Sequence, residues 1–179
     1  MSPPVPAARK DFDQYEKVQS EEYKLMIEKV IAYLIENKIT VATAESCTAG
    51  MIAATIGDFS GVSEIFSQGY ITYSNDAKEK LLGVPHDLLE SFGAVSEEVA
   101  RAMAEGVCKA SGAALGLSAT GIAGPTGGTP DKPVGLVYMG VCYRGKTYVF
   151  CEVFSGDRKA VRTQTVERIF AEIKKILQI

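Results

Sequence analysis

The chain has 179 residues with a formal net charge of −3, and 46% of its residues are hydrophobic. This length accommodates one domain with a single core, and the composition is typical of a folded protein. A surface that coats nucleic acid needs a clear excess of Lys and Arg, so the charge balance predicts no nucleic-acid partner. No apolar run approaches the ~20 residues that span a bilayer, and the N-terminus carries no apolar signal segment, so we expect no membrane association.

Cysteine and histidine are sparse in this sequence. The 4 cysteines form no CxxC pair, and His86 is the single histidine. This spacing predicts no metal site and favours buried thiols in a reducing compartment, which indicates a cytoplasmic location. A Ser-His or Cys-His catalytic pair would have to use His86, which we expect in a polar turn, Val84–Asp87. A nucleophile in this chain is therefore expected to use a lysine, a tyrosine or a carboxylate as its base.

The N-terminal half predicts a tail followed by alternating helices and strands. Early prolines and mixed charges predict a disordered or loosely ordered tail over residues 1–18, before one domain over residues 19–179. Apolar residues at helical spacing predict a helix over 20–37. The other elements expected in this half are strands over 39–44 and 69–73 and helices over 49–56 and 77–82.

The C-terminal half predicts a helix, three strands and a closing helix. The expected elements are a helix over 96–111, a strand over 113–119, a Gly- and Pro-rich loop over 120–133, a β-hairpin over 134–143 and 147–154, and a helix over 157–178. No repeat or change in composition marks a second domain. The order of elements predicts a single α/β domain with a mixed β-sheet flanked by helices.

Ser46 is the first candidate for chemistry. It follows a predicted strand and precedes a predicted helix, where backbone N–H groups can stabilise an oxyanion. The alternative is that Ser46 is the N-cap of that helix, with Thr48 as the other candidate cap. Cys47 is a second candidate nucleophile, since thiolates are stabilised at helix N-termini. The other cysteines are expected in the core.

Lys78 and Tyr73 lie together in the sequence and are the candidates for proton transfer. A lysine acts as a base only when burial or nearby positive charge lowers its pKa from ~10.4. The alternative for Lys78 is a solvated helix lysine, like its neighbour Lys80. Tyr73 is a candidate for orienting or relaying a proton, and the alternative is a half-buried tyrosine with a satisfied hydroxyl.

Two further features are candidates for holding an anion. The loop over 120–133 has 4 glycines and 3 prolines, and its backbone N–H groups can cradle a phosphate, although it matches no nucleotide-binding glycine motif. The alternative is a structural crossover loop. Arg158 and Arg162 lie one turn apart at the start of the last predicted helix, where a cation is unfavourable unless an anion is near. The alternative is that they pair with Asp157 or Glu167.

Several of these segments occur together, in order, over about residues 25–178. They are Ala44–Gly50, Gly69–Lys78, Gly93–Val99, Thr120–Pro125, Lys132–Gly135, and Gly156–Arg158 with Arg162. In this combination the sequence resembles the CinA carboxy-terminal domain family. It departs from the usual family pattern at Ala49, where a glycine is common, and the added methyl restricts the turn or narrows the site.

The resemblance implies hydrolysis of nicotinamide mononucleotide to nicotinic acid mononucleotide and ammonia. It implies Ser46 as nucleophile and Lys78 as base, with support from Tyr73, and no metal or other cofactor. It also implies a small-molecule nucleotide as the partner and a homo-oligomeric protein. The residues expected to contact the substrate are Cys47, Thr48, Gly50, Thr120, Gly121, Gly124, Arg158 and Arg162.

Two other functions remain open on the sequence. The first alternative is a non-catalytic module that binds a nucleotide and regulates a partner. A protein of that kind would tolerate loss of Ser46 and Lys78, and both are present. The third possibility keeps amide hydrolysis and changes the substrate to another small carboxamide, because the motifs report on the chemistry more than on the rest of the substrate.

Overall fold

The computed structural model describes the backbone of residues 8–179 and the side chains of residues 21–179. Its helices are α1 (Ala8–Glu36), α2 (Met51–Gly57), α3 (Asn75–Leu82), α4 (His86–Phe92), α5 (Glu97–Ser111) and α6 (Arg158–Leu177), with a 3₁₀ turn, η1 (Val62–Glu64). Its strands are β1 (Val41–Glu45), β2 (Phe66–Ile71), β3 (Leu115–Gly121), β4 (Leu136–Tyr143) and β5 (Lys146–Val153).

The strands form one 5-stranded sheet in the order β2-β1-β3-β4-β5. Strand β1 pairs in parallel with β2 and β3, whereas β3–β4 and β4–β5 are antiparallel. Every residue of β1 is buried, as expected for a parallel strand covered on both faces. The predicted mixed α/β sheet is confirmed.

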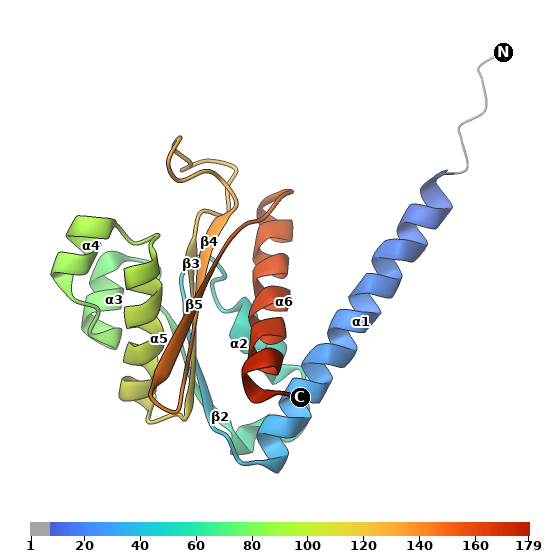
Figure 1. The fold of residues 1–179 in the computed structure, drawn as a ribbon, viewed down its shortest axis with the longest axis horizontal. Coiled ribbons are helices and arrows are strands. Elements are labelled where there is room, and N and C mark those ends of the chain that lie inside the picture. Colours follow the sequence, from blue (N-terminus) through green and yellow to red (C-terminus); the bar gives the residue numbers. More distant parts are fainter. Residues whose placement is uncertain (1–7) are drawn as a thin grey trace.

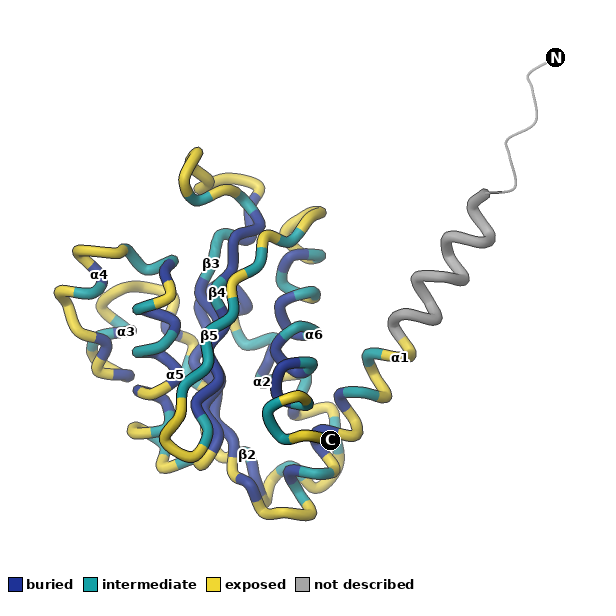
Figure 2. The backbone as a smooth tube through the Cα atoms, in the orientation of Figure 1, coloured by how far each residue is buried: buried dark blue, intermediate teal, exposed yellow. Residues whose placement is uncertain are grey.

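Helices cover both faces of the sheet (Figure 1). Helices α3, α4 and α5 lie on one face, where the core includes Leu82, Leu89 and Met103. Helices α2 and α6, with the C-terminal part of α1, lie on the other face, where the core includes Ile52 and Ile169. Figure 2 shows the burial concentrated in the central strands and on the inward sides of α5 and α6.

The start of α1 differs from the prediction. Residues 8–18, which the sequence assigns to a tail, have a helical backbone that runs on into the predicted helix. Residues 8–20 contain no proline or glycine, so no helix-breaking residue separates Ala8 from the predicted helix. Residues 1–7 of the predicted tail lie outside the described residues.

The prediction of a polar turn at His86 is wrong, because His86 is the first residue of helix α4. Pro85 precedes it with φ −60°, a value that suits the start of a helix. His86 Nδ1 lies 3.0 Å from Glu79 Oε1. This hydrogen bond raises the pKa of His86, whose side chain lies at the surface.

Strand β2 begins and ends earlier than predicted. Gly69, expected to start the strand, lies inside it and pairs with Thr43 of β1. A Cβ at Gly69 would lie 2.9 Å from Thr43 Oγ1, so the glycine permits this close packing. Because the strand ends at Ile71, Thr72 and Tyr73 lie in the loop before α3.

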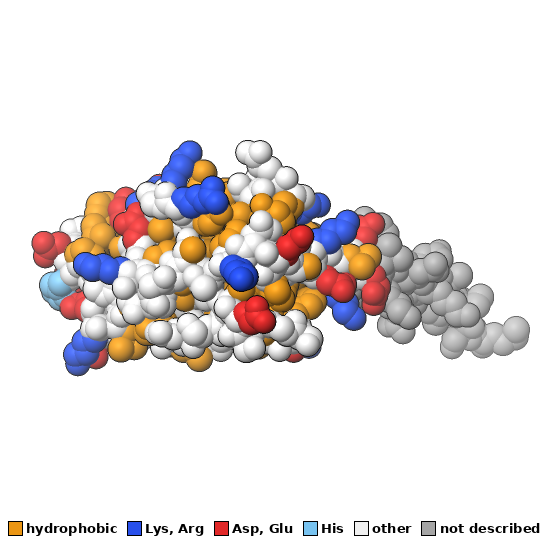
Figure 3. Space-filling model, turned by 90° about the horizontal axis from the view of Figure 1, so that it is seen from below, with side chains coloured by type: hydrophobic (Ala, Val, Ile, Leu, Met, Phe, Trp, Pro, Cys, Tyr) orange, Lys and Arg blue, Asp and Glu red, His pale blue; other side chains and the backbone are white. Residues whose placement is uncertain are grey.

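The surface carries charges of both signs. Viewed from below, Lys and Arg side chains alternate with Asp and Glu side chains, and hydrophobic atoms lie between them (Figure 3). Across the described part of the chain, no helix combines the length and the apolar character that crossing a bilayer requires.

The turn between β1 and α2 contains two consecutive left-handed residues. Ala49 has φ +49° and Gly50 has φ +91°. Glycine adopts this region freely, whereas a residue with a Cβ does so at a cost of ~1–2 kcal/mol. The turn therefore places Ala49 in a strained conformation.

Ala49→Gly is expected to raise the free energy of unfolding by about 1 kcal/mol, because it removes this strain. Urea denaturation at pH 7 measures the change. Ala54→Gly is the matched control: Ala54 is exposed inside α2, where a glycine lowers stability by ~0.5–1 kcal/mol. Equal losses of stability in the two variants would contradict strain at Ala49.

Candidate active site

Ser46 and Lys78 meet at the carboxyl ends of β1 and β2. Ser46 follows β1 directly, and its backbone N–H donates to Ala119 O of β3 (2.9 Å). Lys78 lies in α3, and its Nζ is 3.2 Å from Ser46 Oγ. Helix α2 follows β1 on one face of the sheet and α3 follows β2 on the other, the arrangement that opens ligand sites in α/β sheets (Figure 1).

Lys78 is buried, with 0% of its surface exposed. Its Nζ also contacts two backbone carbonyls, Thr72 O at 2.8 Å and Tyr73 O at 3.3 Å. Among the described side chains it takes part in no ion pair. Lys80 contrasts with it, since Lys80 pairs with Asp76 at the surface (2.9 Å). The alternative of a solvated Lys78 is therefore wrong.

Burial lowers the pKa of Lys78 from its usual value, because a buried ammonium loses its hydration. The neutral amine has two N–H donors and one lone pair. Donation to the Thr72 and Tyr73 carbonyls uses both donors and leaves the lone pair for the Ser46 hydroxyl. This geometry suits transfer of the Ser46 proton to Lys78.

Ser46 and Thr48 are not helix caps, which corrects that alternative. The N-cap position of α2 is Gly50, and no side chain caps the helix from that position. The N–H groups of Gly50, Ile52 and Ala53 instead donate to the buried carboxylate of Glu45, a residue to which the sequence analysis gave no role. Its place at the end of a buried strand, just before the small-residue segment, was the available signal.

Cys47 is buried beside Ser46. Burial, together with the smaller effect of the Glu45 charge, raises the pKa of its thiol to about 12. The thiol therefore stays neutral near pH 7, which argues against a Cys47 thiolate nucleophile.

Tyr73 contributes its carbonyl to the Lys78 site, while its side chain points elsewhere. The side chain is 59% exposed, and its hydroxyl accepts a hydrogen bond from Arg158 Nη2 (3.0 Å). Arg158 Nη1 donates to Gly124 O (2.9 Å). Tyr73, Arg158 and Gly124 thus join the β2–α3 loop, the start of α6 and the Gly-rich loop.

Arg162 connects this region to the Ser46 turn, since its Nη2 donates to Thr48 O (2.7 Å). Arg162 and Arg158 line a pocket of about 430 Å³ with Lys159 at the start of α6. Among the described side chains neither arginine pairs with a carboxylate, and Asp157 instead caps Ala160 N. Asp157 also lines the pocket, so one carboxylate stands against three cations there, and the net positive charge suits an anionic ligand.

Two predicted loop residues have their side-chain positions occupied by the protein. The Thr120 hydroxyl donates to Ala94 O (2.7 Å). At Gly121 a Cβ would lie 2.6 Å from Leu136 O, so close strand packing explains that glycine. Only their backbones remain for substrate contact.

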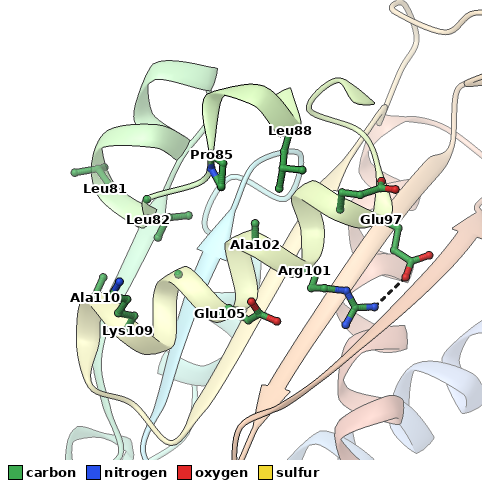
Figure 4. A pocket seen from close by; sticks show the side chains of 13 residues that line it. Leu81, Leu82, Pro85, Leu88, Glu97, Arg101, Ala102, Glu105, Lys109 and Ala110 are labelled. Carbon is green, nitrogen blue, oxygen red and sulfur yellow. Dashed lines mark hydrogen bonds and ion pairs between the residues drawn. The ribbon is translucent and has the colours of Figure 1, made fainter. Parts of the chain in front are cut away.

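A larger pocket of about 800 Å³ lies between α3, α4 and α5 (Figure 4). Leu81, Pro85, Leu88 and Ala102 line it, and Arg101 pairs with Glu97 at its edge (2.9 Å). Neither Ser46 nor Lys78 lines this pocket. Within residues 21–179 no cluster of His, Cys, Asp and Glu has the makeup of a metal site.

Comparison with known proteins identifies the family. Residues 24–177 match the model of the CinA C-terminal domain. A competence-damage inducible protein of Clostridium perfringens is 50% identical over 158 residues, which are 88% of this chain and 38% of that protein. A relative of the same name from Thermoanaerobacter pseudethanolicus is 52% identical over 152 residues, 85% of this chain and 37% of that protein. The chain thus spans less than two fifths of the length of these relatives.

Solved structures of similar proteins share the fold over most of this chain. The competence/damage inducible protein CihA of Agrobacterium tumefaciens superposes with a TM-score of 0.83 at 35% identity, covering 87% of this chain and 95% of that one. The competence damage-inducible protein A of Klebsiella pneumoniae superposes with a TM-score of 0.84 at 30% identity, covering 87% and 97%. Sequence and fold together show that this chain belongs to the CinA C-terminal domain family.

Proposed function

We propose that this domain hydrolyses the carboxamide of nicotinamide mononucleotide, giving nicotinic acid mononucleotide and ammonia. The observation that carries the proposal is the 3.2 Å contact between Lys78 Nζ and Ser46 Oγ, made by a lysine with no exposed surface. The choice of substrate rests on the resemblance to the CinA family and on the positively charged pocket beside the Ser46 turn.

The proposed reaction passes through an acyl-enzyme. Ser46 Oγ attacks the carboxamide carbon while neutral Lys78 takes the hydroxyl proton. The C–N bond then breaks, and Lys78 returns the proton to the leaving nitrogen, so that ammonia departs and an ester on Ser46 remains. Water attacks this ester with its proton passing to Lys78. The C–Oγ bond breaks, Ser46 recovers the proton and the carboxylic acid is released.

The negative oxygen of the tetrahedral intermediate needs hydrogen-bond donors. Glu45 occupies the N–H groups of Gly50, Ile52 and Ala53, which removes them from this role. The N–H groups of Cys47 and Thr48 donate to no backbone oxygen in the described part of the chain, and the acceptor that they face is the Cys47 sulfur, a weak one. We assign these two donors to the oxyanion, and one such donor contributes about 3 kcal/mol in comparable enzymes.

Ser46→Ala is expected to abolish ammonia release from nicotinamide mononucleotide while the protein stays folded, because the nucleophile is lost. Ammonia assays on wild type and variant, with circular dichroism for the fold, measure this. Ser74→Ala is the control, since Ser74 only caps α3. Turnover near the wild-type rate in Ser46→Ala would rule out the proposed nucleophile. A wild type that raises its melting temperature with the nucleotide but releases no ammonia would indicate a binding module.

Lys78→Met is expected to lower kcat by about 10² to 10⁴-fold, the usual contribution of a general base. In wild type, kcat/KM should rise with pH as Lys78 loses its proton, and the midpoint should lie below ~10.4 because burial lowers the pKa of Lys78. Steady-state rates across pH measure both. Lys80→Met, on the same helix, should change neither.

The pKa of Lys78 also predicts a dependence of stability on pH. Its pKa is lower in the folded than in the unfolded state, so the unfolded state binds more protons between the two values. The free energy of unfolding therefore rises with pH across that window, and Lys78→Met should lose this rise. A pH profile of activity and stability unchanged by Lys78→Met would place the base elsewhere.

Arg162→Ala is expected to raise KM for nicotinamide mononucleotide by about 10- to 100-fold, the value of a hydrogen bond to a charged group. The KM for nicotinamide riboside, which lacks the phosphate, should change little, and the comparison separates phosphate binding from damage to the Thr48 contact. Arg101→Ala is the matched control. Equal losses on both substrates would remove Arg162 from phosphate binding.

A further inference from the structure

Glu45 is a carboxylate with no exposed surface at the end of β1. Among the described side chains it pairs with no lysine or arginine. Burial of a carboxylate is costly unless its oxygens are hydrogen-bonded. Its Oε2 accepts from Gly50 N (3.0 Å) and Ile52 N (3.0 Å), and its Oε1 accepts from Ala53 N (2.8 Å). These three hydrogen bonds tie the start of α2 to the end of β1, and the turn between them contains Ser46.

The same residue holds the base through its backbone. The carbonyl of Glu45 accepts from Thr72 N (2.8 Å), and Thr72 O accepts from Lys78 Nζ (2.8 Å). Lys78 in turn contacts Ser46, the residue after Glu45. A closed series of contacts therefore runs from Glu45 through Thr72 and Lys78 to Ser46.

The turn that Glu45 closes is strained, although Ala49 N donates to Ser46 O (3.1 Å) and Met51 N to Thr48 O (3.1 Å) within it. Ala49 and Gly50 both have positive φ, and Ala49 does so at an energetic cost. Because Gly50 N donates to Glu45, the carboxylate fixes the strained end of the turn directly. It also occupies the helix N–H groups, which leaves those of Cys47 and Thr48 as the donors near the nucleophile.

We propose that Glu45 is a positioning residue for the Ser46–Lys78 pair: its buried carboxylate holds the Ser46–Gly50 turn so that Ser46 Oγ stays on Lys78 Nζ and the Cys47 and Thr48 N–H groups stay free for the oxyanion. This inference rests on the proposed function. Glu45 touches neither the substrate nor the reacting atoms in this assignment.

The test compares Glu45→Gln with Glu172→Gln. Glu172 is the control for a buried carboxylate away from the site: it is 5% exposed, lies on α6 and pairs with Arg168 and Lys175. In Glu45→Gln the amide NH₂ faces backbone N–H groups, so the turn shifts. At a temperature where both variants are folded, kcat of Glu45→Gln should fall about 100-fold with KM within about threefold, as expected for misplaced catalytic groups. Glu172→Gln should keep the wild-type kcat.

A second variant covers the case in which Glu45→Gln does not fold. Ala53→Pro removes the N–H that donates to Glu45 Oε1. It removes no helical bond, because the first bond within this helix is Ala54 N to Gly50 O, and the first turn of a helix tolerates proline. The kcat of Ala53→Pro should also fall relative to wild type, while its KM stays near the wild-type value. A kcat at the wild-type level in either folded variant, or a loss that only follows the unfolded fraction, would overturn the proposal.

A third readout separates this inference from the choice of substrate. The rate at which a fluorophosphonate modifies Ser46, followed by mass spectrometry, reports on the nucleophile without any carboxamide. If wild type releases no ammonia, slower labelling of Glu45→Gln than of wild type still supports the role of Glu45. Equal labelling of the two, or no labelling of wild-type Ser46, overturns it.

Discussion

The burial of one amine is the constraint on which the site depends. Lys78 has no exposed surface and no carboxylate partner among the described side chains, so its proton is held weakly. Two carbonyls of the preceding loop and the Ser46 hydroxyl are the only hydrogen-bond partners of Lys78 Nζ in that part of the chain. A lysine in this environment gains little for the fold, because an apolar residue of similar size would pack there without losing hydration. Its presence is explained by the proposed proton transfer.

The sheet topology brings the parts of this arrangement together. Strands β1, β2 and β3 are parallel and neighbouring, so their carboxyl ends lie side by side. Ser46 follows one of these ends, and the loop that binds Lys78 follows the next. The antiparallel hairpin β4–β5 leads into α6, whose first turn supplies Arg158 and Arg162. Residues more than a hundred positions apart in the chain thus meet at one edge of the sheet.

Local sequence predicted the element types well and the connections less well. Caps such as Ser96 and the apolar spacing of the helices are local signals, and the elements that they predict are present. Helix α4 was missed because Pro85 reads equally well as a turn or as a helix start. Strand β2 was displaced because Gly69 looks like a boundary, and only its contact with Thr43 of another strand explains it.

The candidate site shows the same contrast between features that local sequence predicts and features that depend on distant contacts. Ser46 and Lys78 could be named as candidates from their residue types, and their proposed roles came from the resemblance to the CinA family, whereas the exposure of Tyr73 could not be predicted. The role proposed for Glu45 left only a positional signal in the sequence, since its partners are backbone N–H groups, which every residue except proline has. Contacts to backbone atoms leave no trace in residue identity, and they make up most of this site.

The position of β2 has a consequence for how the domain loses function. Strand β2 is an edge strand with most of its residues open to solvent, and it carries the loop and helix that present Lys78. Segments with few buried contacts open locally at a lower free energy than the core. Separation of β2 from β1 would remove the amine from Ser46 while β3, β4 and α6 stay packed. We therefore expect the proposed chemistry to be lost by opening of β2 alone, at a lower free energy than unfolding of the whole domain.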